Sequence, residues 1–179
     1  ADFERGLDPL ELRSDRGLLR EVRICKTPVE RDVLREAHRQ GERVFLALRD
    51  GMLRPGVSEI ELARELFARF EPDGFAVSPL IQSGENGSIP HNPTSRRQLQ
   101  SGDTVVVDSV IRWKAYHSDI TRTFALGEMT PRAKSAYKVV RDAQAAAIEA
   151  ARPGVHCSQL DDIARGVITK AGFGAYFTH

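Results

Sequence analysis

The stretch that decides the fold of this chain is DSVIRWKAYHSD, residues 108–119. Its valine, isoleucine, tryptophan and tyrosine residues favour a β-strand, in which carboxylates are uncommon and usually face water. Asp108 and Asp119 nevertheless stand at its two ends. On one continuous strand they would point to opposite faces, because side chains alternate between the faces and the separation is odd. The alternative is a hairpin that brings the two carboxylates together.

A hairpin folded about Trp113-Lys114 would place Asp108 directly across from Asp119, and we predict this pairing. Directly opposed residues have Cβ atoms about 4.5–5.5 Å apart, so two ionised carboxylates there would repel each other. A divalent cation between them would remove the repulsion, and ligation by oxygen alone suits magnesium or manganese better than zinc. The face that carries the aspartates would comprise Thr104, Val106, Asp108, His117, Asp119, Thr121 and Thr123.

The other face of the predicted hairpin is apolar and suits packing against helices. It would comprise Val105, Val107, Ile111, Tyr116, Ile120, Phe124 and Leu126. The competing interpretation is a hairpin with two solvated aspartates, since Trp113-Lys114 lacks the Asn-Gly chemistry of a strong two-residue turn. Two carboxylates are also too few for a transition-metal site, so a metal centre requires further ligands.

Two capping boxes predict helices before the hairpin. Thr27-Pro28-Val29-Glu30 combines a capping threonine, a proline at the first helical position and a glutamate three residues after the cap. Helical spacing of apolar residues continues until Gly51. Ser58 and Glu61 open a second helix that should end near Asp73-Gly74.

The remaining chain is expected to alternate between sheet, loop and helix. Residues 76–83 have the composition of a strand, and residues 84–103 form a long polar loop of the kind that often carries function. Thr130-Pro131 begins a third helix after the hairpin. Apolar residues from Leu160 to Ile168 indicate a fourth.

An internal repeat appears when the chain is compared with itself at an offset of 98 residues. Residues 54–57 and 152–155 both read RPGV, and Gly74-Phe75 matches Gly172-Phe173. The RPGV match alone could reflect a good turn between helices, but the Gly-Phe match favours a structural repeat. The chain stops six residues after Phe173, so the second copy is expected to lack its sheet.

The composition favours one soluble globular domain. The chain has 179 residues, 41% hydrophobic and 28% charged, with a net charge of +1 and a pI near 8.1, so no broad basic surface for nucleic acid is expected. No apolar run approaches the roughly 20 residues that span a bilayer, and the charged start does not fit a signal peptide. With only Cys25 and Cys157, we expect reduced thiols and a cytoplasmic protein without nucleic-acid or membrane partners.

The run GDTVVVDSVIRWKAYHSDITRTFALGE, residues 102–128, together with IPHNPTSRR, residues 89–97, resembles the proline-specific metallopeptidases of the pita-bread fold. These are Xaa-Pro dipeptidase and aminopeptidase P, with methionine aminopeptidase more distant. The resemblance implies an α+β fold of two pseudo-twofold halves, each of helices and antiparallel sheet, with the second half incomplete here. It divides the chain into a linker from an absent N-terminal domain, residues 1–21, and a partial catalytic domain, residues 22–179.

The resemblance also implies the site residues. Aspartates that match Asp108 and Asp119 bind two divalent metal ions in the family, and manganese, cobalt or zinc are the candidates. Histidines that match His91 and His179 bind substrate or transfer a proton. The family's remaining ligands, one histidine and two glutamates, would follow residue 179, so these 179 residues are expected to be inactive alone, whether they are a segment or a degenerate protein.

Two departures from the family pattern bear on the site. This chain has Asp108-Ser109-Val110 where Asp-Phe-Gly or a similar sequence is usual, and His117 where a smaller or neutral residue is common. Both are expected to affect metal choice or pocket shape. Thr121 and Thr123 lie on the predicted metal face, and we expect them to orient Asp119 by hydrogen bonds.

The resemblance implies a metal-dependent exopeptidase that hydrolyses the bond between an N-terminal residue and a following proline. Its substrates would be small peptides, and the full-length protein would be a homodimer. In the implied mechanism, the metal pair activates a water molecule, and the oxyanion is stabilised by metal and a positioned histidine. The alternatives are a non-catalytic pita-bread module that binds peptides and a metal-free creatinase-like hydrolase. Both fit the retained aspartates less well.

Overall fold

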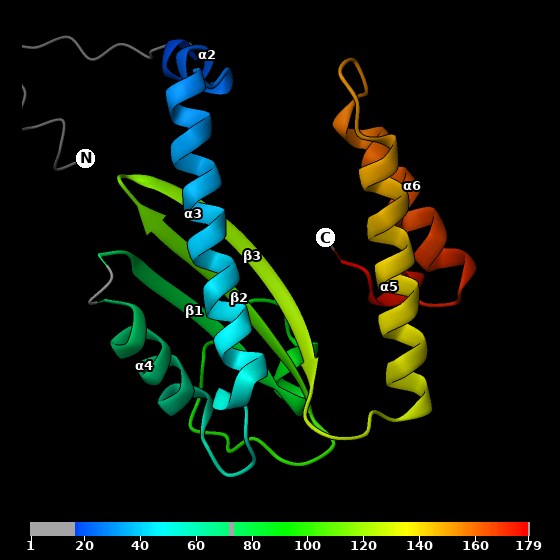
Figure 1. Ribbon diagram of the computed structural model, residues 1–179. Helices are drawn as coiled ribbons and strands as arrows, with labels where there is room; N and C mark the ends of the chain where they lie inside the picture. Colours follow the sequence, from blue (N-terminus) through cyan, green and yellow to red (C-terminus); the bar gives the residue numbers. More distant parts are fainter. Residues whose placement is uncertain (1–16, 72–73, 179) are drawn as a thin grey trace, which may run out of the picture.

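A computed structural model describes residues 17–71 and 74–178 of the chain. Its centre is a three-stranded antiparallel sheet in the order β1-β2-β3, with two helices over one face and a further helix pair beside it (Figure 1). In chain order the elements are α2 Leu18–Ile24, α3 Pro28–Ala47, η1 Leu48–Met52, α4 Glu59–Phe70, β1 Ala76–Ser83, η3 Gly84–Ser88, β2 Thr104–Trp113, β3 Tyr116–Ala125, α5 Pro131–Ala150, α6 Cys157–Lys170 and η4 Gly174–Tyr176.

The two predicted capping boxes are confirmed. At the start of α3, the Thr27 hydroxyl accepts from the Glu30 N–H, and the Glu30 carboxylate accepts from the Thr27 N–H at 2.7 Å. Ser58 and Glu61 form the same pair at the start of α4. After α3 the chain widens into the π-helical turn η1, where Gly51 has a φ of 122° that a residue with a side chain rarely adopts. Local sequence therefore sets where both helices begin and where the first one stops.

The predicted hairpin forms, but its predicted register is wrong. The turn is Lys114-Ala115, with φ of 47° and 66°, and Asp108 pairs with Thr121 rather than with Asp119. Positive φ at both central residues is the two-residue turn whose twist matches that of paired strands. A turn about Trp113-Lys114 would demand positive φ of a bulky aromatic residue, which is costly. The structure instead pairs Trp113 with Tyr116 across the strands.

The correction of the register by two residues leaves the predicted faces intact. Side chains alternate with a period of two, so a slip of two residues keeps every side chain on its face. Val105, Val107 and Ile111 are fully buried on one face. Asp108 lies half-buried on the other, and the predicted division into a helix-covered face and a polar face is confirmed.

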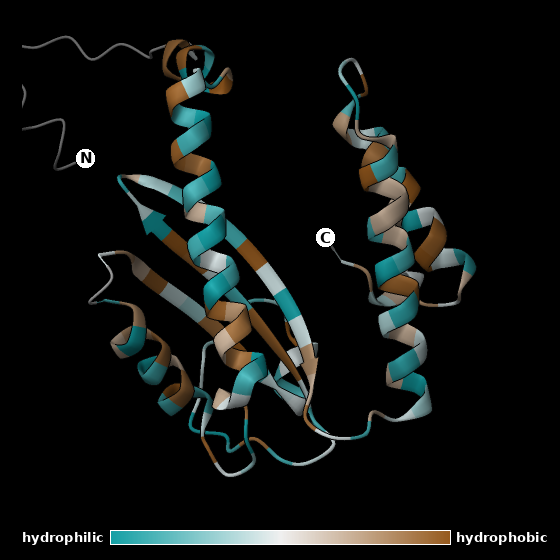
Figure 2. Cartoon of the chain, viewed as in Figure 1, coloured by the Kyte–Doolittle hydropathy of each residue, from teal (hydrophilic) through white to brown (hydrophobic). Residues whose placement is uncertain are grey.

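The core lies between the sheet and helices α3 and α4. Helix α3 packs on β2 and β3, and α4 packs on β1; hydrophobic and hydrophilic residues alternate along α3 in Figure 2. Close approach of α3 depends on Gly41, where an added Cβ would lie 2.7 Å from the Ile120 Cδ1 atom. The fully buried side chains at this interface include Val44, Leu48, Leu62, Leu66, Ile81, Leu99, Val105, Val107 and Ile111.

The second helix pair repeats the order of the first. Helices α3 and α5 have 20 residues each, and each is followed by an RPGV segment and a shorter helix. Helices α5 and α6 pack against each other, and large side chains on this pair remain exposed, among them Val140 at 57% and Ile148 at 67%. This order agrees with the predicted repeat. Among the described residues, no helix is long and apolar enough to cross a membrane.

Two buried serines on the helix-covered face of the hairpin give a test of the core. Within the part of the chain that the structure describes, the Ser109 hydroxyl is buried without a hydrogen-bond partner, whereas the Ser118 hydroxyl donates to the Ala37 carbonyl at 3.0 Å. An unsatisfied buried hydroxyl costs about 1–3 kcal/mol, and a satisfied one contributes about 0.5–1.5 kcal/mol. Ser109→Ala should therefore leave the unfolding free energy unchanged or raise it.

The matched variant Ser118→Ala should lower the unfolding free energy by about 1 kcal/mol. Urea denaturation of both variants beside the wild type measures the difference. Equal destabilisation by the two substitutions would show that Ser109 has a partner that the structure does not describe.

Candidate functional site

Asp108 and Asp119 are diagonal neighbours on the polar face of the hairpin. Asp108 lies opposite Thr121 and Asp119 lies opposite Val110, so the two aspartates are offset by two residues across the strands. Diagonal neighbours have Cα atoms about 7–8 Å apart, which remains within reach of longer side chains. Both side chains lie on the polar face of the sheet, so each aspartate is a charged neighbour of the other.

This proximity disfavours two negative charges. Partial desolvation raises the pKa of Asp119, and the charge of Asp108 and a hydrogen bond to Asp108 raise it further. Like charges at short range favour protonation of one partner. A cation bound between the two groups would reverse that preference, so the arrangement suits a cation.

The threonines act differently from the prediction. The Thr121 hydroxyl donates to Asp108 Oδ1 at 2.9 Å, so it orients Asp108 rather than Asp119. The corrected register explains this, because Thr121 is the residue directly opposite Asp108. Thr123 lies opposite Val106, one step further along the face.

His91 is the third residue of a turn that spans Ile89–Asn92. The Asn92 N–H donates to the Ile89 carbonyl at 3.2 Å, and His91 has a φ of 55°. Proline at the second position and positive φ at the third are the signature of a type II turn. The Gln82 side-chain amide holds this turn by donating to the Ile89 carbonyl at 2.9 Å and to the Asn92 carbonyl at 3.0 Å.

Gln82 brings the His91 turn to the aspartate side of the sheet. It pairs with Val106, and directly paired residues share a face. Val106 and Asp108 are two residues apart on β2, so Gln82 and Asp108 lie on the same face. The turn that Gln82 holds therefore lies over the face that carries Asp108 and Asp119. Sequence reasoning missed Gln82, although a polar residue near the end of an apolar strand was a usable signal.

The other predicted site residues have different positions. His117 pairs with Arg112 near the turn of the hairpin, exposed on the same face as Asp119. His179 lies outside the described residues. Within residues 17–71 and 74–178, no group of three or more His, Cys, Asp or Glu side chains is arranged to hold a metal ion. The described site thus has two carboxylates and an overlying histidine turn.

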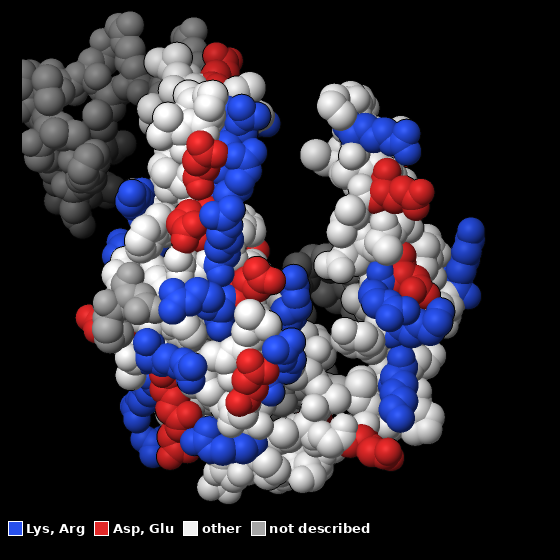
Figure 3. All heavy atoms as spheres, in the orientation of Figure 1, with Lys and Arg blue, Asp and Glu red and all other residues white. Residues whose placement is uncertain are grey.

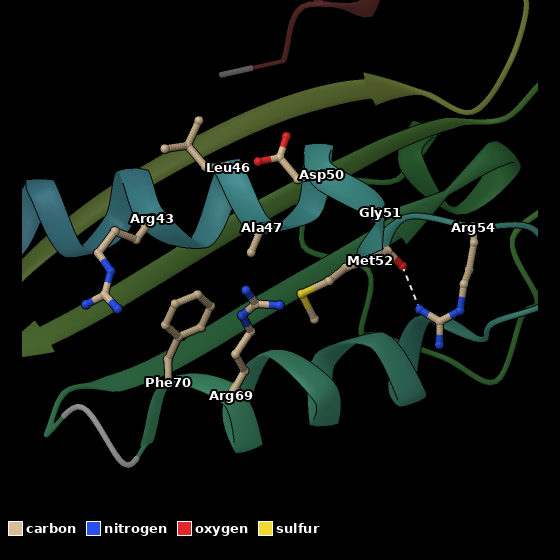
Figure 4. A pocket seen from close by; sticks show the side chains of 9 residues that line it. All are labelled: Arg43, Leu46, Ala47, Asp50, Gly51, Met52, Arg54, Arg69 and Phe70. Carbon is tan, nitrogen blue, oxygen red and sulfur yellow. Dashed lines mark hydrogen bonds between the residues drawn. The ribbon is translucent and has the colours of Figure 1, made fainter.

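A cavity of about 480 Å³ lies elsewhere, between the end of α3 and the end of α4 (Figure 4). Arg43 and Arg69 each stack on the Phe70 ring, 5.8 Å from its centroid, and Arg54 donates to the Met52 carbonyl at 2.9 Å. Cations near helix C-termini offset the partial negative charge there. Both helices cover the apolar face of the sheet, so this cavity is separate from the aspartate face.

Charges on the outer surface of α3 largely cancel. Figure 3 shows basic and acidic side chains interspersed along this helix. Arg35 pairs with Asp32, and Arg39 pairs with Glu36. Exposed pairs of this kind contribute little to stability, and they give α3 a mixed rather than a basic surface.

Comparison with known proteins finds a matching protein family and several similar proteins. The sequence profile of metallopeptidase family M24 matches residues 32–179. The chain is 30% identical to the Xaa-Pro dipeptidase of Pyrococcus furiosus over 181 residues, which cover 99% of this chain and 52% of that protein. It is 37% identical to the probable dipeptidase PepE of Mycobacterium tuberculosis over 165 residues, covering 90% of this chain and 44% of that protein.

The fold also matches solved structures. The recombinant prolidase from Thermococcus sibiricus superposes with a TM-score of 0.91 at 31% identity, over 99% of this chain and 49% of the prolidase chain. The α+β pita-bread fold expected from the resemblance is confirmed by this match. The chain spans about half the length of the curated relatives it matches.

The base of the His91 loop allows a steric test. Arg97 and Asp103 form a two-bonded ion pair, with N···O distances of 2.6 and 3.0 Å. A Cβ added to Gly84, which has a φ of +53°, would lie 2.8 Å from Cζ of Arg97 and from Oδ1 of Asp103. Gly84→Ala should therefore lower the unfolding free energy by roughly 2–4 kcal/mol, from positive-φ strain and overpacking combined.

Gly87→Ala is the matched control in the same loop. Its added Cβ would lie 3.6 Å from Val106 Cγ2, an ordinary contact, so its unfolding free energy should stay within about 1 kcal/mol of the wild type. Denaturation of both variants measures this. Similar tolerance at the two glycines would contradict the packing of Arg97 against Gly84.

Proposed function

The chain belongs to metallopeptidase family M24, and we propose that the protein is a metal-dependent exopeptidase that hydrolyses the bond between an N-terminal residue and a following proline. The observation that carries the proposal is the pair Asp108 and Asp119 on one sheet face, with the His91 turn above it. The names of the relatives, Xaa-Pro dipeptidase and probable dipeptidase, support the substrate class.

We assign Asp108 and Asp119 to a centre of two divalent ions, with manganese, cobalt or zinc as candidates. The donor chemistry fits, because two carboxylates that disfavour each other's ionisation are stabilised by a cation. Oxygen ligands suit hard divalent ions. Two side chains do not complete a two-ion site, so the proposal requires further ligands from outside the described residues.

Each site residue of the chain would have its own role in the reaction. When bound, divalent ions polarise a scissile carbonyl and lower the pKa of coordinated water. Asp108 would hold its orientation through the Thr121 hydroxyl. His91 would bind substrate or transfer a proton at its imidazole from the overlying turn, and we assign the same class of role to His179.

The two alternatives make less use of this arrangement. A non-catalytic peptide-binding module has no need of two like charges at neighbouring positions of one sheet face, and neither has a metal-free creatinase-like hydrolase. Holding such charges together without a cation is unfavourable. The diagonal placement of Asp108 and Asp119 on one sheet face therefore supports the metal-dependent hydrolase.

We propose the compartment, oligomeric state and partners from general features of the chain. We infer a cytoplasmic homodimer that acts on small peptides with proline second, without nucleic-acid or membrane partners. Cys25 and Cys157 are both exposed and free, which suits a reducing compartment. We also propose that residues 1–21 are a linker and residues 22–179 the catalytic domain; helix α2, Leu18–Ile24, crosses this boundary and has no buried residue.

Removal of either aspartate should remove metal. In the complete gene product, Asp108→Ala and Asp119→Ala should lose bound manganese, because each substitution removes a carboxylate ligand of the proposed two-ion centre. Thr121→Val should weaken metal binding by about 10–100-fold, as loss of a group that orients a ligand does. Metal content after dialysis measures all three. Thr123→Val and Asp142→Ala, which removes a carboxylate of helix α5, are controls. Full occupancy in Asp108→Ala or Asp119→Ala would contradict the metal assignment.

Cleavage of Ala-Pro and Ala-Ala dipeptides tests the substrate class. The complete gene product, loaded with manganese, cobalt or zinc, should cleave Ala-Pro with the higher kcat/KM, and a chelator should abolish the activity. Metal-dependent cleavage without a preference for Ala-Pro would overturn the proline assignment alone. Absence of cleavage with every metal would overturn the enzymatic function.

A further inference from the structure

Glu59 is a fully buried carboxylate that serves no helix cap. It is the first residue of α4 and has no exposed surface. The cap of α4 is formed by its neighbours Ser58 and Glu61. A buried carboxylate is costly unless hydrogen bonds compensate it, so the contacts of Glu59 reveal what it does.

Its two oxygens hold the two ends of the loop that carries His91. Oε1 accepts from the Ser83 N–H and hydroxyl, both at 2.7 Å, where β1 ends. Oε2 accepts from the Ser95 N–H at 2.9 Å and the Ser95 hydroxyl at 2.8 Å, where the loop returns. The Asn86 side-chain amide donates to both oxygens, at 3.0 and 3.2 Å. One side chain therefore closes the segment between Ser83 and Ser95.

The returning segment is also fixed against the backbone of α4. The Glu59 N–H donates to the Arg97 carbonyl, and the Ile60 N–H donates to the Ser95 carbonyl, both at 3.0 Å. The first N–H groups of a helix have no partner within the helix, and here two carbonyl groups of the loop accept from them. The loop thus accepts hydrogen bonds from the start of α4, and the Glu59 carboxylate accepts hydrogen bonds from the loop.

The donors outweigh burial in their effect on the charge of Glu59. Burial by itself raises its pKa, but hydrogen bonds from Ser83, Ser95 and Asn86 bring the pKa below its usual value. The group is therefore ionised at neutral pH. Hydrogen bonds to an ionised acceptor are stronger than those between neutral groups, which makes this carboxylate a firm anchor.

The tip of the loop has a second, separate anchor. Gln82 holds the Ile89–Asn92 turn from the polar face of the sheet. Ser83, the next residue, has the opposite orientation and meets Glu59 on the helix side. Consecutive residues of β1 thus fix the tip and the base of one loop from the two faces of the sheet.

We propose that Glu59 is a positioning residue for His91: its carboxylate clamps both ends of the 84–95 loop so that the turn held by Gln82 stays over the Asp108–Asp119 face. The proposal rests on the role proposed for His91 in catalysis. Glu59 does not touch substrate or metal in this assignment. It acts through the loop alone, so its loss should lower activity only through the position of His91.

Glu59→Gln tests the clamp, because the amide keeps the shape but replaces one acceptor oxygen with an NH2 donor that faces other N–H and O–H donors. In the complete gene product, hydrogen exchange of the amides in residues 84–97 should become roughly 10–100-fold faster, the range expected for losing bonds to a buried charged group. Exchange in β2 and β3 and the metal content should not change. Exchange followed by mass spectrometry measures this whether or not the protein is active.

A double-mutant cycle tests whether the clamp acts through His91. His91→Ala alone should keep its metal and lose about 10²–10⁴-fold in kcat/KM on Ala-Pro, as for a positioned acid–base group. Glu59→Gln alone should lose roughly 10–100-fold. The double variant should be no slower than His91→Ala, because residues that act as a unit are not additive.

Glu61→Gln is the matched control, since Glu61 lies on the same turn of α4 and its side chain bonds to Ser58. It should leave exchange in the loop and kcat/KM unchanged. Should Glu59→Gln fail to fold, Ser95→Ala is the second variant. It removes the hydroxyl that donates to Glu59 and accepts from Asn86 and from the Arg97 N–H, and it keeps the backbone N–H bond to Glu59. Exchange in residues 93–97 then gives the same comparison.

The outcomes separate this proposal from the proposed function. Unchanged loop exchange in Glu59→Gln overturns the clamp, and an additive loss in the double variant overturns positioning through His91. Wild-type activity in His91→Ala also overturns that positioning role, while leaving the peptidase assignment intact. A wild-type protein without peptidase activity overturns the proposed function, and loop exchange then still decides whether Glu59 holds the loop.

Discussion

The arrangement of the site depends on the two-residue turn at Lys114-Ala115. This turn fixes the register of β2 and β3, and the register determines that Asp108 faces Thr121 while Asp119 faces Val110. A slip of β3 by one residue would move every β3 side chain to the other face, sending Asp119 into the core and Ile120 and Phe124 toward water. The burial of Val105, Val107 and Ile111 against α3 prevents such a slip. The packing that stabilises the fold therefore also holds the two carboxylates together.

The features that the sequence predicted correctly are the local ones. The starts of α3 and α4 follow from capping residues within four positions of each other, and β1 was predicted with its observed bounds. The division of the hairpin into two faces followed from alternation alone. The register required a choice between two turns that differ by one position, and sequence periodicity of two cannot distinguish registers that keep the same faces. The available signal for choosing between the two turns was that a bulky aromatic residue such as Trp113 rarely adopts positive φ.

The residues that anchor the His91 loop could not be predicted from local sequence, because their partners are distant along the chain. Glu59 resembles any acidic residue in the first turn of a helix, where a negative charge is generally favourable. Its partners Ser83 and Ser95 lie 24 and 36 residues away along the chain, and nothing in their spacing marks them. Only the folded chain shows that the start of α4 passes between the end of β1 and the returning loop. Functional geometry in long loops is fixed by such distant contacts.

The diagonal placement of the aspartates makes them unequal. Asp108 is half-buried and receives a hydrogen bond from Thr121, whereas Asp119 is exposed, faces an apolar valine and has a raised pKa. Direct opposition would have left each carboxylate facing only the other, with the threonine displaced along the strand. With the observed register, the orientation of Asp108 is fixed by the hydroxyl of the residue directly opposite it. The residue directly opposite Asp119 is Val110, whose apolar side chain offers no hydrogen bond. The register thus gives the two carboxylates different surroundings on one face of the sheet.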